Sequence, residues 1–425
     1  MKSTSKNKTK KVFILPYLFP VRSEAWIKYQ VMGLAARNWQ VTVLARNIEE
    51  GIQTQELENI DKAGVSRWLY SDQRSSNRII KMFQVLKQCL SHPTKISWLK
   101  GSGGFKRTDL FYALEVIRIL RRHNSPIIHV HFGHNGALLA EAGWKTPTIV
   151  SWHGSDANVY PNIYGVECYK KLFDQDWWHT VGSDFMYNRL LEIGAREDRI
   201  VKIPVGTNLA EFPFVDRTAR PSDSLKVILV GRLEIMKGHT FLIKAVSLLL
   251  KKGLKIELKI IGEGSLRSEL ENEIQSLHLN NQIKLLGACT SAQVYEHLVA
   301  ADLFALTGVV ADNGRVETQG VVFAEAQATG LPVIGCDVGG VSESLVHGKT
   351  GMLVPPKDIN AIAEAIEKYA SNRELRFLHG QAGTAFVRKN FSIEKTLDEL
   401  EDFICNDQSR FLNQRKLLTA FHSYC

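Results

Sequence analysis

Short apolar runs alternate with longer amphipathic stretches along most of the chain. The apolar runs are rich in Val, Ile and Leu, which is typical of strands buried on both faces of a parallel sheet. The predicted strands are 12–15, 39–44, 127–131, 148–151, 177–181, 201–204, 225–230, 256–261, 283–286, 303–306, 332–336 and 352–354. Between them, apolar residues recur every three or four positions, which predicts helices. These are 26–36, 136–143, 183–193, 241–251, 265–276, 292–300, 321–328 and 358–370, with two or three more in 78–122.

This alternation predicts an α/β protein with parallel sheets covered by helices on both faces. The Pro- and Ser-rich segment 213–224 is the best linker, and the alternation restarts after it. We therefore expect two Rossmann-like domains, 1–212 and 225–390, facing across a cleft. Segment 391–425 is expected to supply a C-terminal helix that crosses back to the first domain, followed by a tail. Ligands of such sheets bind at the carboxyl ends of the strands.

Composition and charge narrow the class of protein. The 425 residues include 53 Lys and Arg against 44 Asp and Glu, and segment 62–122 holds 13 basic and three acidic residues. A solvated surface explains this excess, and so does an anionic partner. No nucleic-acid-binding module is visible, so a membrane surface or an acceptor phosphate is the better candidate. There is no apolar run near 18 residues, and the six cysteines are scattered. We expect a cytoplasmic protein that is at most peripheral on the inner face of the plasma membrane.

The stretch 312–332 carries the clearest candidate chemistry. It predicts a polar loop, a turn at Gly320 and a helix, with Glu317 on the loop and Glu325 inside the helix. A helix N-terminus exposes free N–H groups and partial positive charge, which attract phosphate. Two carboxylates on either side of that phosphate suit the hydroxyl groups of a sugar and a ribose.

Three other strand ends are candidates, each with an ordinary structural alternative. Arg232 and Lys237 follow strand 225–230 and suit a diphosphate, although surface cations explain them as well. Gly262 permits close approach of a ligand or simply makes a tight turn. His153 places an imidazole at a strand end and could reach the cleft, although a lone histidine is more often structural. The HVHFGH sequence could suggest a metal, but no carboxylate has ligand spacing, so we expect none.

Together these elements resemble one family. The order GRL, KG, IGEG, VETQGVVFAEAQATGLPVI, GG and TGMLVPP is similar to the retaining, nucleotide-sugar-dependent glycosyltransferases of family 4, which have the two-Rossmann GT-B fold. RSEAW, HFGHNG, SWHGSD and IPVGTN resemble landmarks of its first half, most closely in bacterial exopolysaccharide and colanic-acid-type transferases. Thr207-Asn208 and Ala25-Trp26 depart from the common residues at their positions, which weakens inferences about the acceptor.

The resemblance assigns roles to matching positions. It implies that Arg232, Lys237 and the N–H groups of the helix start hold the donor diphosphate. It implies that Glu325 accepts from the ribose hydroxyls, that Glu317 contacts the transferred sugar and that His153 hydrogen-bonds this sugar. The helix-start residues are Gly320, Val321 and Val322, and the turn expected to meet the base is Leu286-Gly287.

The expected activity is transfer of a hexose, with retention and without a metal or cofactor. The donor is expected to be a UDP- or GDP-sugar and the acceptor a saccharide or a lipid-linked saccharide, in the biosynthesis of a cell-surface polysaccharide. The residues leave two alternatives open: another GT-B enzyme, such as a phosphorylase or a nucleotide-sugar epimerase, and a non-catalytic nucleotide-sugar binder.

Overall fold

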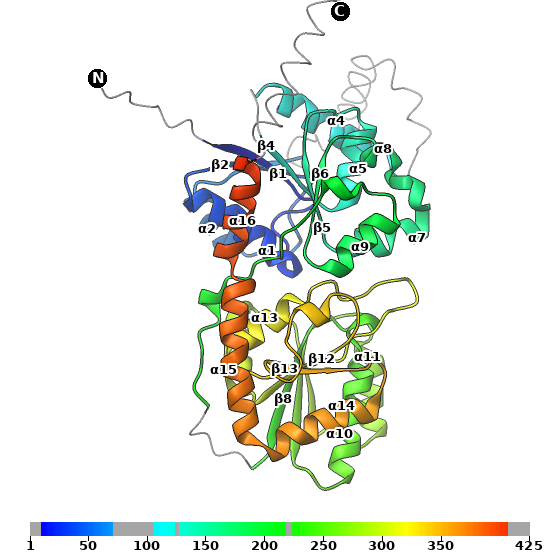
Figure 1. Ribbon diagram of the computed structural model, residues 1–425, viewed down its shortest axis with the longest axis vertical. Coiled ribbons are helices and arrows are strands. Elements are labelled where there is room, and N and C mark those ends of the chain that lie inside the picture. Colours follow the sequence, from blue (N-terminus) through cyan, green and yellow to red (C-terminus); the bar gives the residue numbers. More distant parts are fainter. Residues whose placement is uncertain (1–9, 71–104, 124–126, 218–222, 407–425) are drawn as a thin grey trace, which may run out of the picture. The chain divides into compact units, whose positions relative to one another are not determined.

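The computed structural model describes residues 10–70, 105–123, 127–217 and 223–406. Contacts divide the chain into two units (Figure 1). Unit 1 consists of Met1–Val181, Tyr187–Ile203 and Leu397–Cys425, and unit 2 consists of Gly182–Met186 and Pro204–Thr396. Residues 204–212, which the sequence assigns to the first domain, thus make their contacts in unit 2, as do residues 391–396. The part of 78–122 that precedes residue 105 lies outside the described residues.

Unit 1 is built on a seven-stranded sheet in the order β3-β2-β1-β4-β5-β6-β7. All neighbouring strands are parallel. The strands are β1 Lys11–Leu15, β2 Gln40–Ala45, β3 Ser66–Leu69, β4 Ile127–His131, β5 Ile149–Trp152, β6 Trp178–Val181 and β7 Ile200–Lys202. The helices include α1 Ala25–Ala36, α2 Thr54–Lys62, α4 Arg107–Arg121, α5 Gly133–Glu141, α6 Ser155–Asn158, α7 Tyr160–Tyr164, α8 Lys170–Phe173 and α9 Asp184–Glu192.

Unit 2 has a six-stranded parallel sheet in the order β10-β9-β8-β11-β12-β13. The strands are β8 Leu225–Val230, β9 Ile256–Ile261, β10 Ile283–Gly287, β11 Leu303–Leu306, β12 Val333–Cys336 and β13 Gly351–Val354. Its helices include α10 His239–Lys251, α11 Arg267–Ser276, α12 Ser291–Ala300, α13 Val321–Ala328, α14 Ile359–Ser371 and α15 Arg373–Asn390, and α16 Ile393–Asn406 follows them along the chain. Helices α10 and α14 pack together, and so do α13 and α15 (Figure 1).

Apolar side chains explain why these strands lie inside. All four residues of β5, β11 and β12 are buried, and Leu258, Phe304 and Ile334 in unit 2 are fully covered. Each strand predicted from the hydrophobic pattern is present, and its ends differ from the prediction by at most two residues. The prediction of two parallel α/β domains is therefore confirmed. In each sheet the strand order reverses once, between β1 and β4 and between β8 and β11, where ligands of such sheets bind.

Helix α16 begins in unit 2 and continues in unit 1. In unit 2, Thr207 exchanges backbone hydrogen bonds with Phe391 and Ile393, each 2.9 Å long. In unit 1, the Glu401 carboxylate accepts from Arg37 at 2.8 Å and from the Trp39 indole N–H. Asp398 of α16 also pairs with Arg37 at 2.7 Å. An apolar contact is added by the edge-to-face pair of Trp178 and Phe403, with ring centroids 5.2 Å apart.

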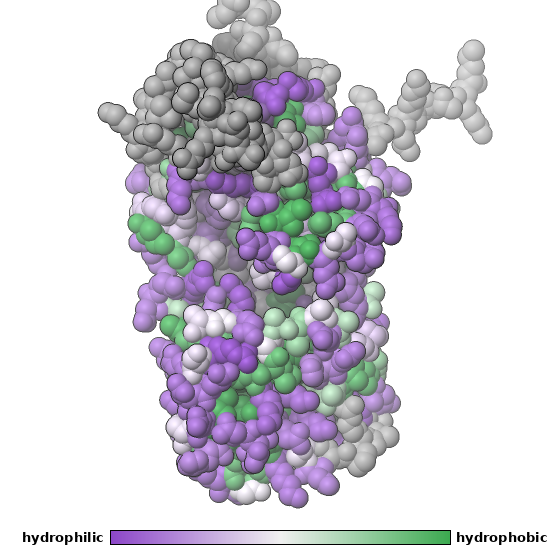
Figure 2. Space-filling model, turned by 180° about the vertical axis from the view of Figure 1, so that it is seen from behind, coloured by the Kyte–Doolittle hydropathy of each residue, from purple (hydrophilic) through white to green (hydrophobic). Residues whose placement is uncertain are grey.

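Polar side chains predominate on the face of the molecule shown in Figure 2, and apolar ones form small patches among them. Within the described ranges, no helix combines the length and apolar character needed to cross a bilayer.

Candidate functional site

A glycine fixes the loop that follows β8, residues 231–238, which we call the cation loop. Gly238 has φ +67° at the start of α10, and a Cβ there would lie 1.8 Å from the Thr307 carbonyl oxygen. The Thr307 hydroxyl donates to the Gly238 carbonyl at 2.8 Å. The ends of β8 and β11 are thus hydrogen-bonded together where the strand order reverses. Lys237 is the last residue of a short 3-10 helix in this loop.

Lys237 and Glu317 form an ion pair at this edge of the sheet, between Nζ and Oε2. Each side chain is only 13% exposed, so both charges are largely withdrawn from water. The sequence assigns the lysine to phosphate and the glutamate to a sugar, and it gives no sign of contact between two residues 80 positions apart. The structure brings them together and lets each compensate the charge of the other.

Arg232 belongs to a second charged group on the same loop. Its guanidinium lies 3.0 Å from one Glu234 carboxylate oxygen, and the Arg315 guanidinium lies 3.0 Å from the other. The Arg232 side chain is 53% exposed and thus open to solvent. Sequence reasoning missed Glu234 and Arg315, although Arg315 stands in the polar loop that also holds Glu317. In this group of five charged side chains, three cations share two carboxylates.

The loop that carries Glu317 is fastened at several points within unit 2. The Gln319 amide exchanges two 2.8 Å hydrogen bonds with the backbone of Val205, and the Ser183 hydroxyl donates to the Thr318 carbonyl at 2.6 Å. Gly340 N–H donates to the Glu317 carbonyl at 2.9 Å. These bonds fix the backbone on which the Glu317 carboxylate is mounted. Gln319 was not among the predicted residues, because a lone amide in a polar loop carries no distinctive pattern.

Gly320 and the start of α13 follow directly. Gly320 adopts φ +75° and caps the helix, so that Val321 and Val322 occupy its first turn. Their backbone N–H groups have no partner within the helix itself, which leaves a partial positive charge at this end. Glu325 lies one turn further along α13 and is mostly buried. In the part of the chain that the structure describes, no hydrogen bond or ion pair holds its carboxyl group.

Burial raises the pKa of Glu325 from 4.5 to about 8, with a smaller contribution from the Glu211 carboxylate. The charged form lacks compensating donors, so the neutral acid is favoured at physiological pH. A ligand that donates hydroxyl hydrogens to this group would favour the carboxylate.

Glycines also close the ends of β9 and β10. Gly262 N–H donates to the Gly287 carbonyl at 2.9 Å, and a Cβ on Gly262 would lie 2.0 Å from the Gly231 carbonyl oxygen. Gly262 has φ +143° and Gly287 has φ +78°. The predicted positions Gly262, Leu286 and Gly287 therefore lie at neighbouring strand ends, beside the cation loop, where only glycine permits this backbone approach.

His153 follows β5 in unit 1, in a loop that one buried carboxylate organises. Asp156 accepts from the N–H groups of Gly133 and Gly154 at 2.8 Å and from that of His153 at 3.1 Å. Burial raises the pKa of Asp156, and these backbone donors oppose the rise. The carboxylate thus fixes the backbone of His153 relative to the start of α5.

His153 also closes a row of stacked imidazoles, His129, His131 and His153, which we call the histidine row. Ring centroids lie 4.7 Å apart for His129 and His131 and 5.2 Å apart for His131 and His153. His131 Nδ1 lies 3.0 Å from His153 Nε2, and His129 Nε2 lies 2.6 Å from the Ser151 hydroxyl. Burial lowers the pKa of all three histidines, to about 4 for His129 and about 3 for His153. The row is therefore neutral.

Two histidines of HVHFGH have partners other than a cluster of ligand side chains in this arrangement. Among the residues that the structure describes, no three His, Cys, Asp or Glu side chains gather as metal ligands would. The rings of His129 and His131 stack on β4. The nitrogens of His129 are directed to Gln30 and Ser151, and Nδ1 of His131 is directed to His153.

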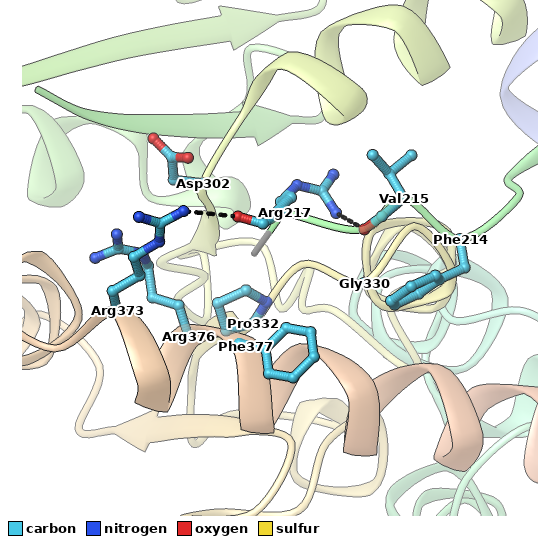
Figure 3. A pocket seen from close by; sticks show the side chains of 9 residues that line it. All are labelled: Phe214, Val215, Arg217, Asp302, Gly330, Pro332, Arg373, Arg376 and Phe377. Atoms are coloured by element: carbon cyan, nitrogen blue, oxygen red, sulfur yellow. Dashed lines mark hydrogen bonds between the residues drawn. The ribbon is translucent and has the colours of Figure 1, made fainter. Parts of the chain in front are cut away.

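A cavity of about 40 Å³ in unit 2 lies at the amino ends of β11 and β12, away from these residues (Figure 3). Arg217 donates to the Leu298 carbonyl at 2.9 Å and to the Ala301 carbonyl at 3.1 Å, at the end of α12. Arg376 donates to the carbonyls of the last turn of α14. These arginines complement negative helix ends. The lining residues are Phe214, Val215, Arg217, Asp302, Gly330, Pro332, Arg373, Arg376 and Phe377, and none is a predicted site residue.

Comparison with known proteins identifies the class to which this fold and these strand-end residues belong. The family model "Glycosyltransferase Family 4" matches residues 23–211, and "Glycosyl transferases group 1" matches residues 213–385. The two matches follow one another along most of the chain, and the chain belongs to the glycosyltransferases.

Two curated relatives are similar over most of their length. The chain is 27% identical to the amylovoran biosynthesis glycosyltransferase AmsK of Erwinia amylovora, over 81% of this chain and 87% of that protein. It is also 27% identical to the putative colanic acid biosynthesis glycosyltransferase WcaL of Escherichia coli, over 83% of this chain and 88% of that protein. The predicted resemblance to exopolysaccharide and colanic-acid-type transferases is confirmed.

Solved structures show the same fold at low identity. A glycosyltransferase from Rickettsia africae superposes with a TM-score of 0.71 at 19% identity and covers 96% of this chain and 99% of that chain. Anabaena Alr3699/HepE in complex with UDP and glucose superposes with a TM-score of 0.71 at 15% identity and covers 94% and 100%. These neighbours are GT-B glycosyltransferases, so the predicted fold class is confirmed.

Proposed function

We propose that this glycosyltransferase takes its sugar from a nucleoside diphosphate sugar bound at the carboxyl edge of the unit 2 sheet. The observation that carries the proposal is the group of Arg232, Lys237 and Arg315, three cations that share two carboxylates beside the N-terminus of α13. Such a site retains net positive charge and suits a diphosphate. The complex of Alr3699/HepE with UDP and glucose supports the same class of donor.

The residues divide the work of donor recognition in this proposal. Arg232, Lys237 and the N–H groups at Gly320, Val321 and Val322 hold the diphosphate. Glu325 accepts from the ribose hydroxyls, and the strand ends at Gly262, Leu286 and Gly287 meet the base. When phosphate binds, Lys237 exchanges its partner, and the released Glu317 carboxylate turns to the sugar hydroxyls.

The transferred group is a hexose in this proposal, and its anomeric configuration is retained. As the anomeric bond breaks, negative charge grows on the leaving diphosphate. Fixed cations and helix N–H groups stabilise that charge more in the transition state than in the ground state. This chain's own cations supply the charge that a divalent metal would otherwise provide, so we expect transfer to proceed in the presence of a chelator.

The acceptor is a saccharide or a lipid-linked saccharide in the biosynthesis of a surface polysaccharide. The names of AmsK and WcaL support this placement. We place the enzyme in the cytoplasm, where nucleotide sugars are made, and at an anionic membrane surface. The exposed apolar residues Ile163, Tyr164 and Val166 lie in sequence just before Lys170 and Lys171, a combination that suits a membrane interface.

A thermal-shift series with UDP-, GDP-, ADP- and dTDP-glucose tests donor binding, because a ligand of the native state raises the unfolding midpoint by mass action. One nucleotide sugar is expected to raise it, and Arg232→Ala is expected to abolish the rise. No shift with any of the four, in a protein that remains folded, contradicts the proposal. Sedimentation with vesicles that contain or lack anionic lipid tests the membrane contact separately. Equal amounts of protein bound to both kinds of vesicle contradict it.

A further inference from the structure

The hydrogen bond between His131 and His153 can run in either direction, and the tautomers of the two rings decide which. His131 is the last residue of β4, and His153 follows β5 on the neighbouring strand. His131 Nδ1 and His153 Nε2 lie 3.0 Å apart, and the rings are nearly parallel at 18°. Burial holds both pKa values well below the ordinary 6.5, so each ring is neutral and carries a single proton. One ring donates and the other accepts.

The opposite edge of His131 distinguishes the two arrangements. His131 is 1% exposed, and its Nε2 is buried without a hydrogen-bond partner among the described residues. If His153 donated, the single proton of His131 would sit on Nε2 as a buried N–H group without an acceptor. If His131 donates from Nδ1 instead, its Nε2 carries a lone pair that accepts no hydrogen bond. Among backbone groups, orphaned buried N–H donors are rarer than under-satisfied acceptors, and we apply the same preference to the imidazole of His131.

His129 shows that this row fixes tautomers individually. The Gln30 amide nitrogen is 3.0 Å from His129 Nδ1 and can only donate, so Nδ1 accepts. The proton of His129 therefore lies on Nε2, which donates to the Ser151 hydroxyl at 2.6 Å. Two stacked imidazoles thus carry their protons on opposite nitrogens, each set by its neighbour.

We propose that His131 is a positioning residue that donates Nδ1–H to His153 Nε2 and holds His153 as the Nδ1–H tautomer. His153 then has its hydrogen-bond donor on Nδ1 and its lone pair on Nε2, where it accepts from His131. Use of this donor toward a hydroxyl oxygen of the transferred sugar rests on the proposed function. The proton position itself does not, because it belongs to the protein without donor.

Imidazole nitrogen NMR of the ¹⁵N-labelled full-length protein tests the proton position. The His153 signals are assigned by comparison with His153→Gln. The wild type is expected to show a protonated Nδ1 and an unprotonated Nε2 on His153 between pH 6 and 8. A protonated Nε2 on His153 in the wild type overturns the proposal, whatever the transfer activity is.

Two substitutions at His131 separate positioning from packing. Asn places an amide N–H close to the position of Nδ1–H, whereas Leu fills the space without a donor. His131→Asn is expected to keep the His153 tautomer and to stay within about 3-fold of wild-type kcat/KM. His131→Leu is expected to give mixed tautomers and to lose about 10-fold, the equivalent of one hydrogen bond. Equal losses in Asn and Leu variants that both retain the wild-type tautomer overturn the positioning role.

His179→Leu is the matched control, because His179 is equally buried in the same unit and accepts from the Trp152 indole at 3.1 Å. It is expected to lower stability while leaving the His153 signals unchanged. If it shifts the His153 tautomer as much as His131→Leu does, the direct role of His131 is refuted. If His131→Leu does not fold, the wild-type and His131→Asn spectra decide the question. Absence of donor binding with the expected tautomer refutes the proposed function alone.

Discussion

The histidine row of unit 1 and the cation loop of unit 2 both lie at carboxyl ends of parallel strands, yet they handle charge in opposite ways. The row consists of the buried His129 and His131 and the half-buried His153, three stacked neutral rings, with a hydrogen bond between His131 and His153. The cation loop buries Lys237 as a charged side chain against Glu317. The neutral row fixes the direction of its hydrogen bonds. In the ion pair, by contrast, the lysine can change its partner from Glu317 to an anionic ligand. The ion pair of unit 2 is therefore the arrangement that suits an anionic ligand, and the histidine row of unit 1 suits a neutral one.

Breaking the ion pair should produce the largest loss of stability. Lys237→Met leaves the Glu317 carboxylate buried without a partner, which costs about 3–5 kcal/mol. The double variant Lys237→Met/Glu317→Leu removes both charges and should recover most of this loss without recovering transfer. Urea unfolding of the single and double variants measures the coupling. Equal stability of single and double variants would show that the pair is not electrostatically coupled.

Glu325 should produce the next largest effect, and it depends on pH. Its folded-state pKa of about 8 lies above the ordinary 4.5, so the folded state binds this proton more tightly than the unfolded state does. The resulting stability is complete below pH 4.5 and is lost as pH rises through 8. We expect Glu325→Gln to gain about 3 kcal/mol on wild type between pH 5 and 8.5. If the free energies of unfolding of the wild type and Glu325→Gln change in parallel with pH, the raised pKa of Glu325 is contradicted.

Binding of the donor should also change the protonation of Glu325. If ribose hydroxyls hydrogen-bond the Glu325 carboxylate, binding releases a proton near pH 7.5 and strengthens as pH rises. Calorimetry in two buffers of different ionisation enthalpy measures this release. It should disappear in Glu325→Gln, and its persistence in that variant would assign the proton to another group.

Substitution of Asp156, which fixes the His153 loop in unit 1, should have a smaller effect on stability. Asp156→Ala leaves the N–H groups of Gly133, His153 and Gly154 without their acceptor, at a cost of about 2 kcal/mol. The exposed Asp174→Ala is the control and should change stability little. Thermal unfolding of both variants measures the two losses of stability. Equal unfolding midpoints would contradict the proposed role of Asp156.

Arg232→Ala should have the smallest effect on stability, below about 0.5 kcal/mol, because the side chain is 53% exposed and its pairing with Glu234 is screened by water. Transfer should nevertheless be lost, since the diphosphate loses a charged contact. Lys226→Ala removes an exposed cation at the other end of β8 and is the control. Equal turnover in the two variants would remove Arg232 from the site.

The strands could be predicted from sequence because burial on both faces leaves an unbroken apolar run. Helix α2 and strand β3 could not, because segment 50–77 mixes polar and apolar residues without a period. Helix α15 was missed because it contains Gly380 and Gly383, which normally weaken a helix. A Cβ on Gly380 would lie 2.1 Å from the Gly330 carbonyl oxygen. These glycines therefore permit close packing against the end of α13.

The sequence singles out the candidate residues one at a time, but it does not indicate their pairings. Strand ends mark Arg232, Lys237 and His153 as neighbours of a ligand site. The contact of Lys237 with Glu317 depends on how the loops after β8 and β11 fold back, which no local pattern encodes. The bond between His131 and His153 had a usable signal, since both residues stand at the ends of adjacent strands, β4 and β5.

Helix α16 has a practical consequence for dissecting the enzyme gene. A stop codon placed after the last predicted strand and helix of unit 2 would leave Thr207 without its backbone partners Phe391 and Ile393. It would also strip the unit 1 surface of Leu397 and Phe403, which cover Gly33 and Trp178. Neither half can therefore be cut out as one continuous stretch of codons. Separate expression requires a rejoined reading frame in which residues 397–406 are fused back to unit 1.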